Sequence, residues 1–232
     1  MVGYDPEVAM FARLAAAVVI VALMAPVSRL PAQAEPFALA DRHHITFTAG
    51  LLTTTQAGSS VGVPGVVVEA GASGLLGGFG YEYWLDDRLA VGVRLSALDA
   101  TANVTVTGSA ARVESGVVAA VLFGGRYQVA RLTASNALRP YVTLGVGPLI
   151  GSADGVSAGF PTAVTSVHQT VASGLVAIGA DVSLGRRVTL GVDAGYLLAA
   201  DFRQRVGART NYSAPVFTLS LGVLLGGGRV GR

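Results

Sequence analysis

The stretch "RLAVGVRLSAL", Arg88 to Leu98, alternates apolar residues with small or polar ones along almost its whole length. Successive side chains of a β-strand point to opposite faces, so one face here is apolar and the other carries Arg94. In a soluble sandwich the apolar face points into a core and Arg94 lies in solvent. In a membrane-spanning barrel the apolar face points to lipid and Arg94 points into the protein. The rest of the sequence decides between these two arrangements.

The composition is too apolar for an ordinary soluble domain. The 232-residue chain is 52% hydrophobic and 13% charged, whereas soluble domains carry about 25% charged residues. The mean hydropathy is +0.58. A helical membrane protein needs apolar runs of about 18 residues or more, and beyond the N-terminal segment every apolar run is soon interrupted by Gly, Ser, Thr or a charged residue. The hydropathy is therefore spread over many short segments, as in a protein built of strands.

Several classes of function and site are disfavoured by the residues present. The chain has no cysteine, which excludes disulfides and thiolate metal sites. Its 16 basic residues are all arginine and form no long run, so we expect no nucleic-acid partner. His43 and His44 are adjacent in a predicted strand and point to opposite faces, so they cannot chelate one ion. The glycine-rich stretches do not lead into helices and are not phosphate loops. We expect no metal and no cofactor.

The N-terminal segment has the order of a secretory signal peptide. Arg13 precedes the apolar run "LAAAVVIVALM", Leu14 to Met24, and the small residues "AQA", Ala32 to Ala34, follow it. Eleven residues of helix cover only about 16 Å of a hydrocarbon core that is about 30 Å thick. The run is therefore too short to span a membrane as a helix.

We expect a signal peptide over residues 1–34, cleaved after Ala34, and a barrel over residues 35–232. An uncleaved N-terminal anchor is the alternative. Met1 and Met10 are both candidate start residues.

From His43 onward the apolar pattern has a period of two, which is the signal of β-strands. Each segment has at least the roughly 9 to 11 residues that a tilted strand needs to cross a bilayer. The eight predicted strands are His43–Leu52, Ala72–Trp84, Arg88–Leu98, Val113–Gln128, Arg139–Ile150, Thr170–Leu184, Val188–Leu198 and Ala214–Leu225.

The connections between these strands alternate in length. Tight turns are expected at Asp86–Asp87 and at Gly185–Arg187, and a link of intermediate length surrounds Asn136. The other links are long and rich in Gly, Ser, Thr and Ala. Short turns at one end and long loops at the other are typical of outer-membrane barrels. We therefore predict an all-β fold, a single eight-stranded antiparallel up-and-down transmembrane β-barrel. Its surface loops are expected near Ser59, Gly108, Gly155 and Arg205.

Aligning the strands by parity gives one face without charges and one face with polar, small and charged residues. A charge-free outer face is stable in lipid, and a small polar inner face suits a narrow lumen. A buried charge without a partner costs several kcal/mol, so the inner charges predict a lumenal ion-pair network with a structural role. Arg94 is expected to pair with an inner carboxylate, and a proton or ion pathway is the alternative role. The predicted network comprises Glu82, Arg94, Arg126, Asp181 and Asp193.

Aromatic residues gather at the predicted strand ends. Such residues commonly form girdles at the two membrane interfaces. Those near the short turns are Tyr81, Tyr83, Trp84, Tyr127 and Tyr141, and those near the long loops are Tyr196, Phe202, Tyr212 and Phe217.

The stretches "GGFGYEYWLDDRLAVGVRLSAL" and "RPYVTLGVG" resemble the small outer-membrane β-barrel proteins of Gram-negative bacteria, the group of the OmpA/OmpX, OmpW and opacity-protein barrels. The resemblance implies export to the bacterial outer membrane, periplasmic turns and variable surface loops. It also implies contact with membrane lipid and lipopolysaccharide, insertion by the barrel-assembly machinery and ligand binding through the loops. Such barrels often end on an aromatic residue, whereas this chain ends "LLGGGRVGR".

Three function classes follow. The leading one is a closed, side-chain-filled barrel with a structural or surface-interaction role. The alternative is a narrow conduit for small or hydrophobic solutes, as proposed for OmpW-type barrels. The third is a lipid-modifying enzyme built on His168, with Ser166 and Ser173 nearby. No paired spacing fixes a nucleophile and a base around His168, so we predict that the protein has no catalytic residues and is not an enzyme.

Overall fold

The computed structural model describes residues 38–53, 66–70, 73–100, 102–106, 110–129, 138–157, 163–207 and 209–226. The expected signal peptide, residues 1–34, lies outside them. The described strands are β1 (His43–Thr53), β2 (Val66–Ala70), β3 (Ser73–Trp84), β4 (Leu89–Asp99), β5 (Ala102–Val106), β6 (Ala110–Gln128), β7 (Leu138–Ser157), β8 (Ala163–Leu184), β9 (Val188–Ala199) and β10 (Ala214–Leu225). No helix in the described part of the chain is long and apolar enough to cross a membrane.

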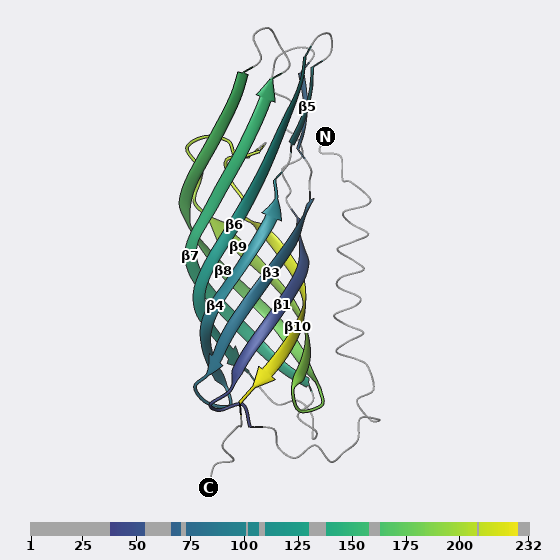
Figure 1. Cartoon of the computed structure of the whole chain (residues 1–232). Helices are drawn as coiled ribbons and strands as arrows, with labels where there is room; N and C mark the ends of the chain where they lie inside the picture. Colours follow the sequence, from purple (N-terminus) through teal and green to yellow (C-terminus); the bar gives the residue numbers. More distant parts are fainter. Residues whose placement is uncertain are drawn as a thin grey trace, which may run out of the picture.

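Eight of these strands form a closed antiparallel barrel with tilted strands (Figure 1). Each strand pairs with the next in the order β1, β3, β4, β6, β7, β8, β9 and β10, and β10 pairs with β1 to close the ring. The short strands β2 and β5 pair with each other, and β5 pairs with the start of β6, so they prolong the β3–β4 hairpin beyond the barrel. The predicted eight-stranded up-and-down barrel is confirmed.

Individual residues explain why the short turns form. In the β3–β4 turn, the Asp86 carboxylate accepts hydrogen bonds from the backbone N–H groups of Arg88 and Leu89 at 2.6 and 2.7 Å, a turn-forming role that suits aspartate. In the β8–β9 turn, Gly185 has a φ of 81°, a conformation that a residue with a side chain rarely adopts. Both turns lie at the same end of the barrel (Figure 1).

The outer surface is an apolar belt, which decides the orientation of the Arg88 to Leu98 stretch. Val91 and Leu95 of β4 are 42% and 43% exposed, whereas Ala90 and Leu98 of the alternate row are buried. The same holds around the ring, where Phe47 and Phe79 pack edge to face on the outside with ring centroids 5.6 Å apart. A continuous apolar belt of this kind is favourable only in lipid. The prediction that the apolar face points outward is confirmed.

Several strands are longer than the sequence pattern predicted. β7 and β8 have 20 and 22 residues, about twice what crossing a bilayer requires, and they rise above the shorter strands (Figure 1). Gly155 therefore lies within β7 and not in a loop. The composition near it resembles that of loops, but the ladder with β6 and β8 continues through it. The predicted loop positions Ser59 and Gly108 lie outside the described residues.

Candidate functional site

The inward-facing rows of the strands change character along the barrel. Near the short turns they carry polar residues, and toward the long hairpins they carry apolar ones. In β9, for example, the row runs from Thr189 through Asp193 to Leu197, all three buried. We call the first part of the lumen the polar layer. The polar layer consists of His44, Thr46, Thr48, Glu82, Arg126, Arg139, Tyr141, Thr143, Asp181, Thr189, Asp193, Thr218 and Ser220.

Arg126 lies at the centre of the polar layer and contacts two carboxylates. Its Nη1 donates a hydrogen bond to Asp181 Oδ2 at 2.6 Å. Its Nε lies 3.2 Å from Glu82 Oε1, an ion pair in which the N–H direction does not meet hydrogen-bond geometry. The guanidinium also lies 4.0 Å from the ring centre of Tyr141, a cation–π contact. The structure thus brings together Glu82, Arg126 and Asp181, three of the five residues predicted for the lumenal network.

Asp193, the fourth predicted residue, is held by hydroxyl groups. Tyr141 donates a hydrogen bond to its Oδ1 at 2.7 Å, and Thr218 donates to its Oδ2 at 2.9 Å. Tyr141 therefore links Asp193 to Arg126. Tyr141 was expected in an outer aromatic girdle, and that prediction is wrong, because its side chain is buried inside the barrel. Its parity with Thr143 on β7 is the signal that places it inside.

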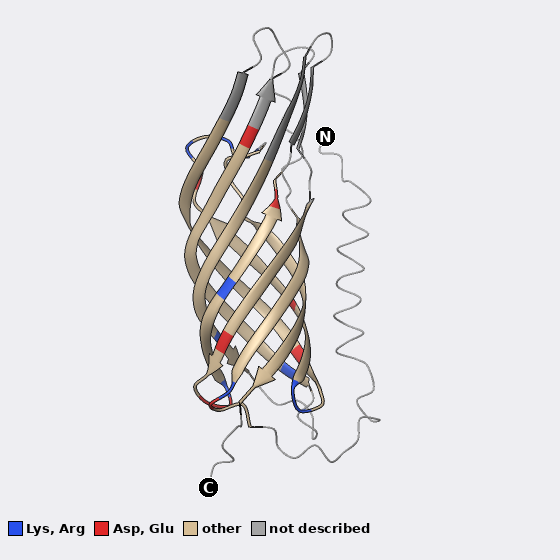
Figure 2. Cartoon of the chain, in the orientation of Figure 1, with Lys and Arg blue, Asp and Glu red and all other residues tan. Residues whose placement is uncertain are grey.

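Two further polar-layer residues were missing from the predicted network. His44 Nδ1 lies 3.2 Å from Glu82 Oε2, and its Nε2 lies 2.9 Å from the Thr189 hydroxyl. Arg139 is also buried and lies opposite Asp181 in the β7–β8 ladder. Figure 2 shows that the charged residues of the strands gather mainly toward the short-turn end. Parity along β1 and β7 could have added His44 and Arg139.

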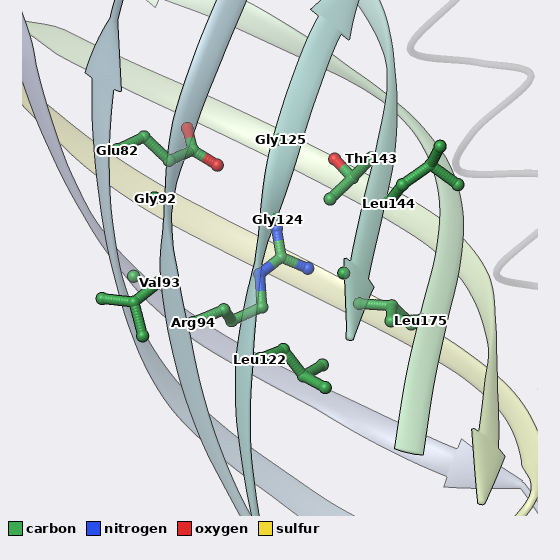
Figure 3. A pocket seen from close by; sticks show the side chains of 12 residues that line it. Glu82, Gly92, Val93, Arg94, Leu122, Gly124, Gly125, Thr143, Leu144 and Leu175 are labelled. Atoms are coloured by element: carbon green, nitrogen blue, oxygen red, sulfur yellow. The ribbon is translucent and has the colours of Figure 1, made fainter. Parts of the chain in front are cut away.

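Arg94, the fifth predicted residue, stands apart from these ion pairs. No hydrogen bond or ion pair within 4 Å joins its side chain to another described residue, and its interaction with Glu82, one of the expected partners, is a longer-range electrostatic attraction. Its guanidinium instead borders a cavity of about 30 Å³. Figure 3 shows the guanidinium directed toward Gly124, with Glu82 on one side and Thr143 on the other.

The second part of the lumen, which we call the apolar layer, is filled by hydrocarbon side chains. Part of it comes from the β9–β10 connection, residues 200–207 and 209–213, which we call the plug loop. Phe202, Val206 and Tyr212 of the plug loop are buried among strand residues, and the side-chain amide of Gln169 makes two hydrogen bonds to the backbone of Gln204. The strand residues of the apolar layer are Leu52, Leu98, Val118, Ala120, Leu122, Leu149, Ala153, Leu175, Ala177, Leu197, Ala214 and Val216.

A second, smaller apolar cluster lies at the short-turn end. Leu39, just before β1, packs with Trp84 and Leu224, and the Asp87 carboxylate accepts a hydrogen bond from the Leu39 N–H at 2.7 Å.

The aromatic-girdle prediction therefore holds only in part. Tyr81, Tyr127 and Tyr196 are exposed on the outer surface. The prediction is wrong for the four aromatic residues that are buried inside the barrel, namely Trp84, Tyr141, Phe202 and Tyr212.

Ser166 and His168, two of the three residues considered for catalysis, lie on the outward-facing row of β8. Ser166 Oγ lies 3.2 Å from His168 Nε2, and both side chains are exposed on β8. Asp154 lies opposite Ser166 in the β7–β8 ladder, but no hydrogen bond joins it to His168. Ser173 donates its hydroxyl proton to the Gly147 carbonyl oxygen at 2.9 Å and does not join the pair. Among the described residues no cluster of three or more His, Asp or Glu residues could hold a metal ion.

A closed eight-stranded barrel with a lipid-facing belt and a packed polar and apolar interior defines an integral β-barrel of the outer membrane. The chain matches the family described as "Outer membrane protein beta-barrel domain" over residues 15–223 and belongs to it. The protein is therefore an outer-membrane β-barrel of Gram-negative bacteria, and its apolar belt contacts membrane lipid.

The solved structures to which this chain is similar have low sequence identity to it. The outer membrane protein OprG from Pseudomonas aeruginosa is 15% identical, with 81% of this chain and 97% of that chain covered and a TM-score of 0.49. Neisserial surface protein A is 12% identical, with 80% and 97% covered and a TM-score of 0.43. Ail of Yersinia pestis is 12% identical, with 80% and 99% covered and a TM-score of 0.41. No curated protein sequence matches this chain significantly.

Proposed function

We propose that the protein is a closed membrane anchor that presents its long hairpins to partners outside the cell. The closure of the lumen at both ends carries this proposal. Leu39 and Trp84 fill the short-turn end, and Phe202, Val206 and Tyr212 fill the other end. An eight-stranded barrel has an interior just wide enough for side chains, and here the chain supplies those side chains from both its strands and its connections.

The projecting hairpins supply the interaction surface in this proposal. The β7–β8 ladder continues from Leu138–Val182 to Ser157–Ala163, so a paired sheet and not a loose loop extends beyond the bilayer. Its outer face is polar at Ser152 and His168. We propose that lipopolysaccharide and an extracellular ligand are the partners on this side, and that the barrel-assembly machinery inserts the chain.

Surface labelling tests the orientation and the presentation of the hairpins. Because the natural chain has no cysteine, His168→Cys and Asp86→Cys each supply a single thiol. In intact cells a membrane-impermeant maleimide should label the cysteine at position 168 and should label the one at position 86 only after the outer membrane is permeabilised. Labelling of position 86 alone in intact cells would overturn the proposal.

A narrow conduit for small or hydrophobic solutes is the second candidate. Two observations favour a conduit. The first is the apolar layer, which could contact an apolar solute. The second is a break in the β6–β7 ladder between the pairs Ala120–Leu149 and Phe123–Val146. Pro148 lies in this break, and proline lacks the N–H group that a ladder requires. Reconstituted vesicles should take up an apolar solute faster with Phe202→Ala than with the natural chain if this conduit exists, and equally slowly if it does not.

We propose no enzymatic activity. A general base needs a partner that fixes its tautomer, and in the described residues only Ser166 contacts His168. The lipid composition of cells producing His168→Ala should equal that of cells producing the natural chain. A lipid modification lost in this variant would establish the enzymatic alternative.

A further inference from the structure

We propose that Arg94 and Thr143 bind a small inorganic anion of about the size of chloride in the lumen. The site is the cavity of about 30 Å³ that separates the polar layer from the apolar layer. Glu82 and Thr143 border it from the polar layer, and Leu122 and Leu175 border it from the apolar layer. The proposal is independent of what the surface hairpins bind.

Two hydrogen-bond donors at the cavity, Arg94 and Thr143, make no hydrogen bond to another described residue. Arg94 has no hydrogen bond or ion pair within 4 Å to another described residue. The Thr143 side chain is 8% exposed, and its hydroxyl makes no hydrogen bond. A buried polar group without a partner is costly, and the half-buried Arg94 side chain carries a positive charge. A ligand that accepts hydrogen bonds and carries a negative charge satisfies both groups.

Glu82, the carboxylate that borders the same cavity, already has other partners. Its Oε1 is paired with Arg126 and its Oε2 with His44, each at 3.2 Å. Both oxygens are therefore engaged away from Arg94. The Arg94 guanidinium, which Figure 3 shows between Glu82 and Thr143, attracts Glu82 electrostatically but makes no ion pair or hydrogen bond with it within 4 Å. Its N–H groups therefore still need an acceptor, and an anion in the cavity supplies one.

Two of the glycines that line the cavity cannot carry side chains that would fill it. A Cβ atom at Gly92 would lie 2.0 Å from the Tyr81 carbonyl oxygen, and one at Gly124 would lie 1.9 Å from the Leu144 carbonyl oxygen. Both distances are far below van der Waals contact, so these positions next to Arg94 require glycine. The volume exceeds the roughly 10 to 15 Å³ that one water molecule needs, and it accommodates one ion of chloride size.

The test compares thermal unfolding of the detergent-solubilised barrel in sodium chloride with that in sodium gluconate at equal ionic strength. Binding to the folded state should raise the midpoint temperature by about 3 to 5 °C for each tenfold rise in chloride above its dissociation constant. Arg94→Gln and Thr143→Val should each reduce this chloride-specific increment. The matched control Arg203→Gln, on the exposed part of the plug loop, should keep it.

A crystal soaked in sodium bromide gives a direct measurement that requires no variant to fold. An anomalous peak within hydrogen-bond distance of Arg94 and Thr143 is expected. The proposal is overturned if no peak appears there and chloride and gluconate act alike, which is the result for a cavity that holds water only. It is also overturned if Arg94→Gln folds and keeps the full chloride increment.

Discussion

The two halves of the lumen are both filled by side chains, but those of one half are polar and those of the other are apolar. In the polar layer the space is filled by groups such as Arg126, Asp181 and Tyr141, which satisfy one another through ion pairs and hydrogen bonds. In the apolar layer it is filled by hydrocarbon, to which the plug loop contributes Phe202 and Val206. Only the polar layer depends on matching partners, because apolar contacts are not directional.

This difference predicts how each half responds to mutation. Removing one member of the polar layer leaves a buried charge without its partner, whereas removing one member of the apolar layer leaves a cavity. The largest losses of stability should therefore come from the polar layer.

The largest effect is expected for Arg126→Ala, which removes a cation that contacts both Glu82 and Asp181. The free energy of unfolding should fall by about 3 to 5 kcal/mol because both carboxylates lose their ion pair with Arg126. Urea titration followed by the gel shift between folded and unfolded barrel measures this. Arg203→Ala, at an exposed loop residue, should change it by less than about 0.5 kcal/mol.

Neutral side chains provide a further control on this first prediction. Adding Glu82→Gln and Asp181→Asn to Arg126→Ala should restore part of the lost stability, because the carboxylates then carry no charge. If the triple variant is no more stable than Arg126→Ala, the loss does not arise from unpaired charge.

A smaller loss is expected for Phe202→Ala in the apolar layer. Truncating a buried phenylalanine costs about 3 to 5 kcal/mol, and the loss at Phe202 should lie near the lower end because a loop can close over part of the space. The same truncation at lipid-facing Phe123, which is 58% exposed, should cost clearly less. The same urea titration compares the two. Equal losses would mean that Phe202 is not packed in the lumen.

The smallest effect is expected for Tyr141→Phe. This change removes the hydroxyl that donates to Asp193 but keeps the ring beside Arg126. A hydrogen bond to a charged group contributes about 1.5 to 3 kcal/mol, so a loss near the lower end is expected, whereas Tyr127→Phe on the outer surface should have no measurable effect. A loss at position 127 as large as that at position 141 would contradict the polar layer as described.

The sequence predicted the barrel and the face of each strand that points to lipid, because strand parity and connection length are local signals. The bounds of β10 are the same in the prediction and in the structure, and those of β1 and β9 differ by one residue at one end. The upper parts of β7 and β8 were missed because Gly, Ser and Thr there resemble loop composition, whereas pairing with neighbouring strands decides their structure.

The candidate site was predictable residue by residue but not contact by contact. Parity placed Glu82, Arg94, Arg126, Asp181 and Asp193 inside the barrel. Which of these residues pair depends on strand stagger, which the sequence pattern does not contain. The role of the network as a structural element remains a proposal that the Arg126→Ala series tests. The plug loop was missed because a connection that folds back into the lumen has no periodic signal.

Electrical recording tests the central claim, that both ends of the barrel are closed, most directly. The purified natural chain is added to a planar lipid bilayer, after its heat-modifiable migration in gels has shown that it is folded. The account predicts insertion without stable single-channel steps, because Leu39 and Trp84 close one end and Phe202, Val206 and Tyr212 close the other. Reproducible open-channel steps from the natural chain would contradict it.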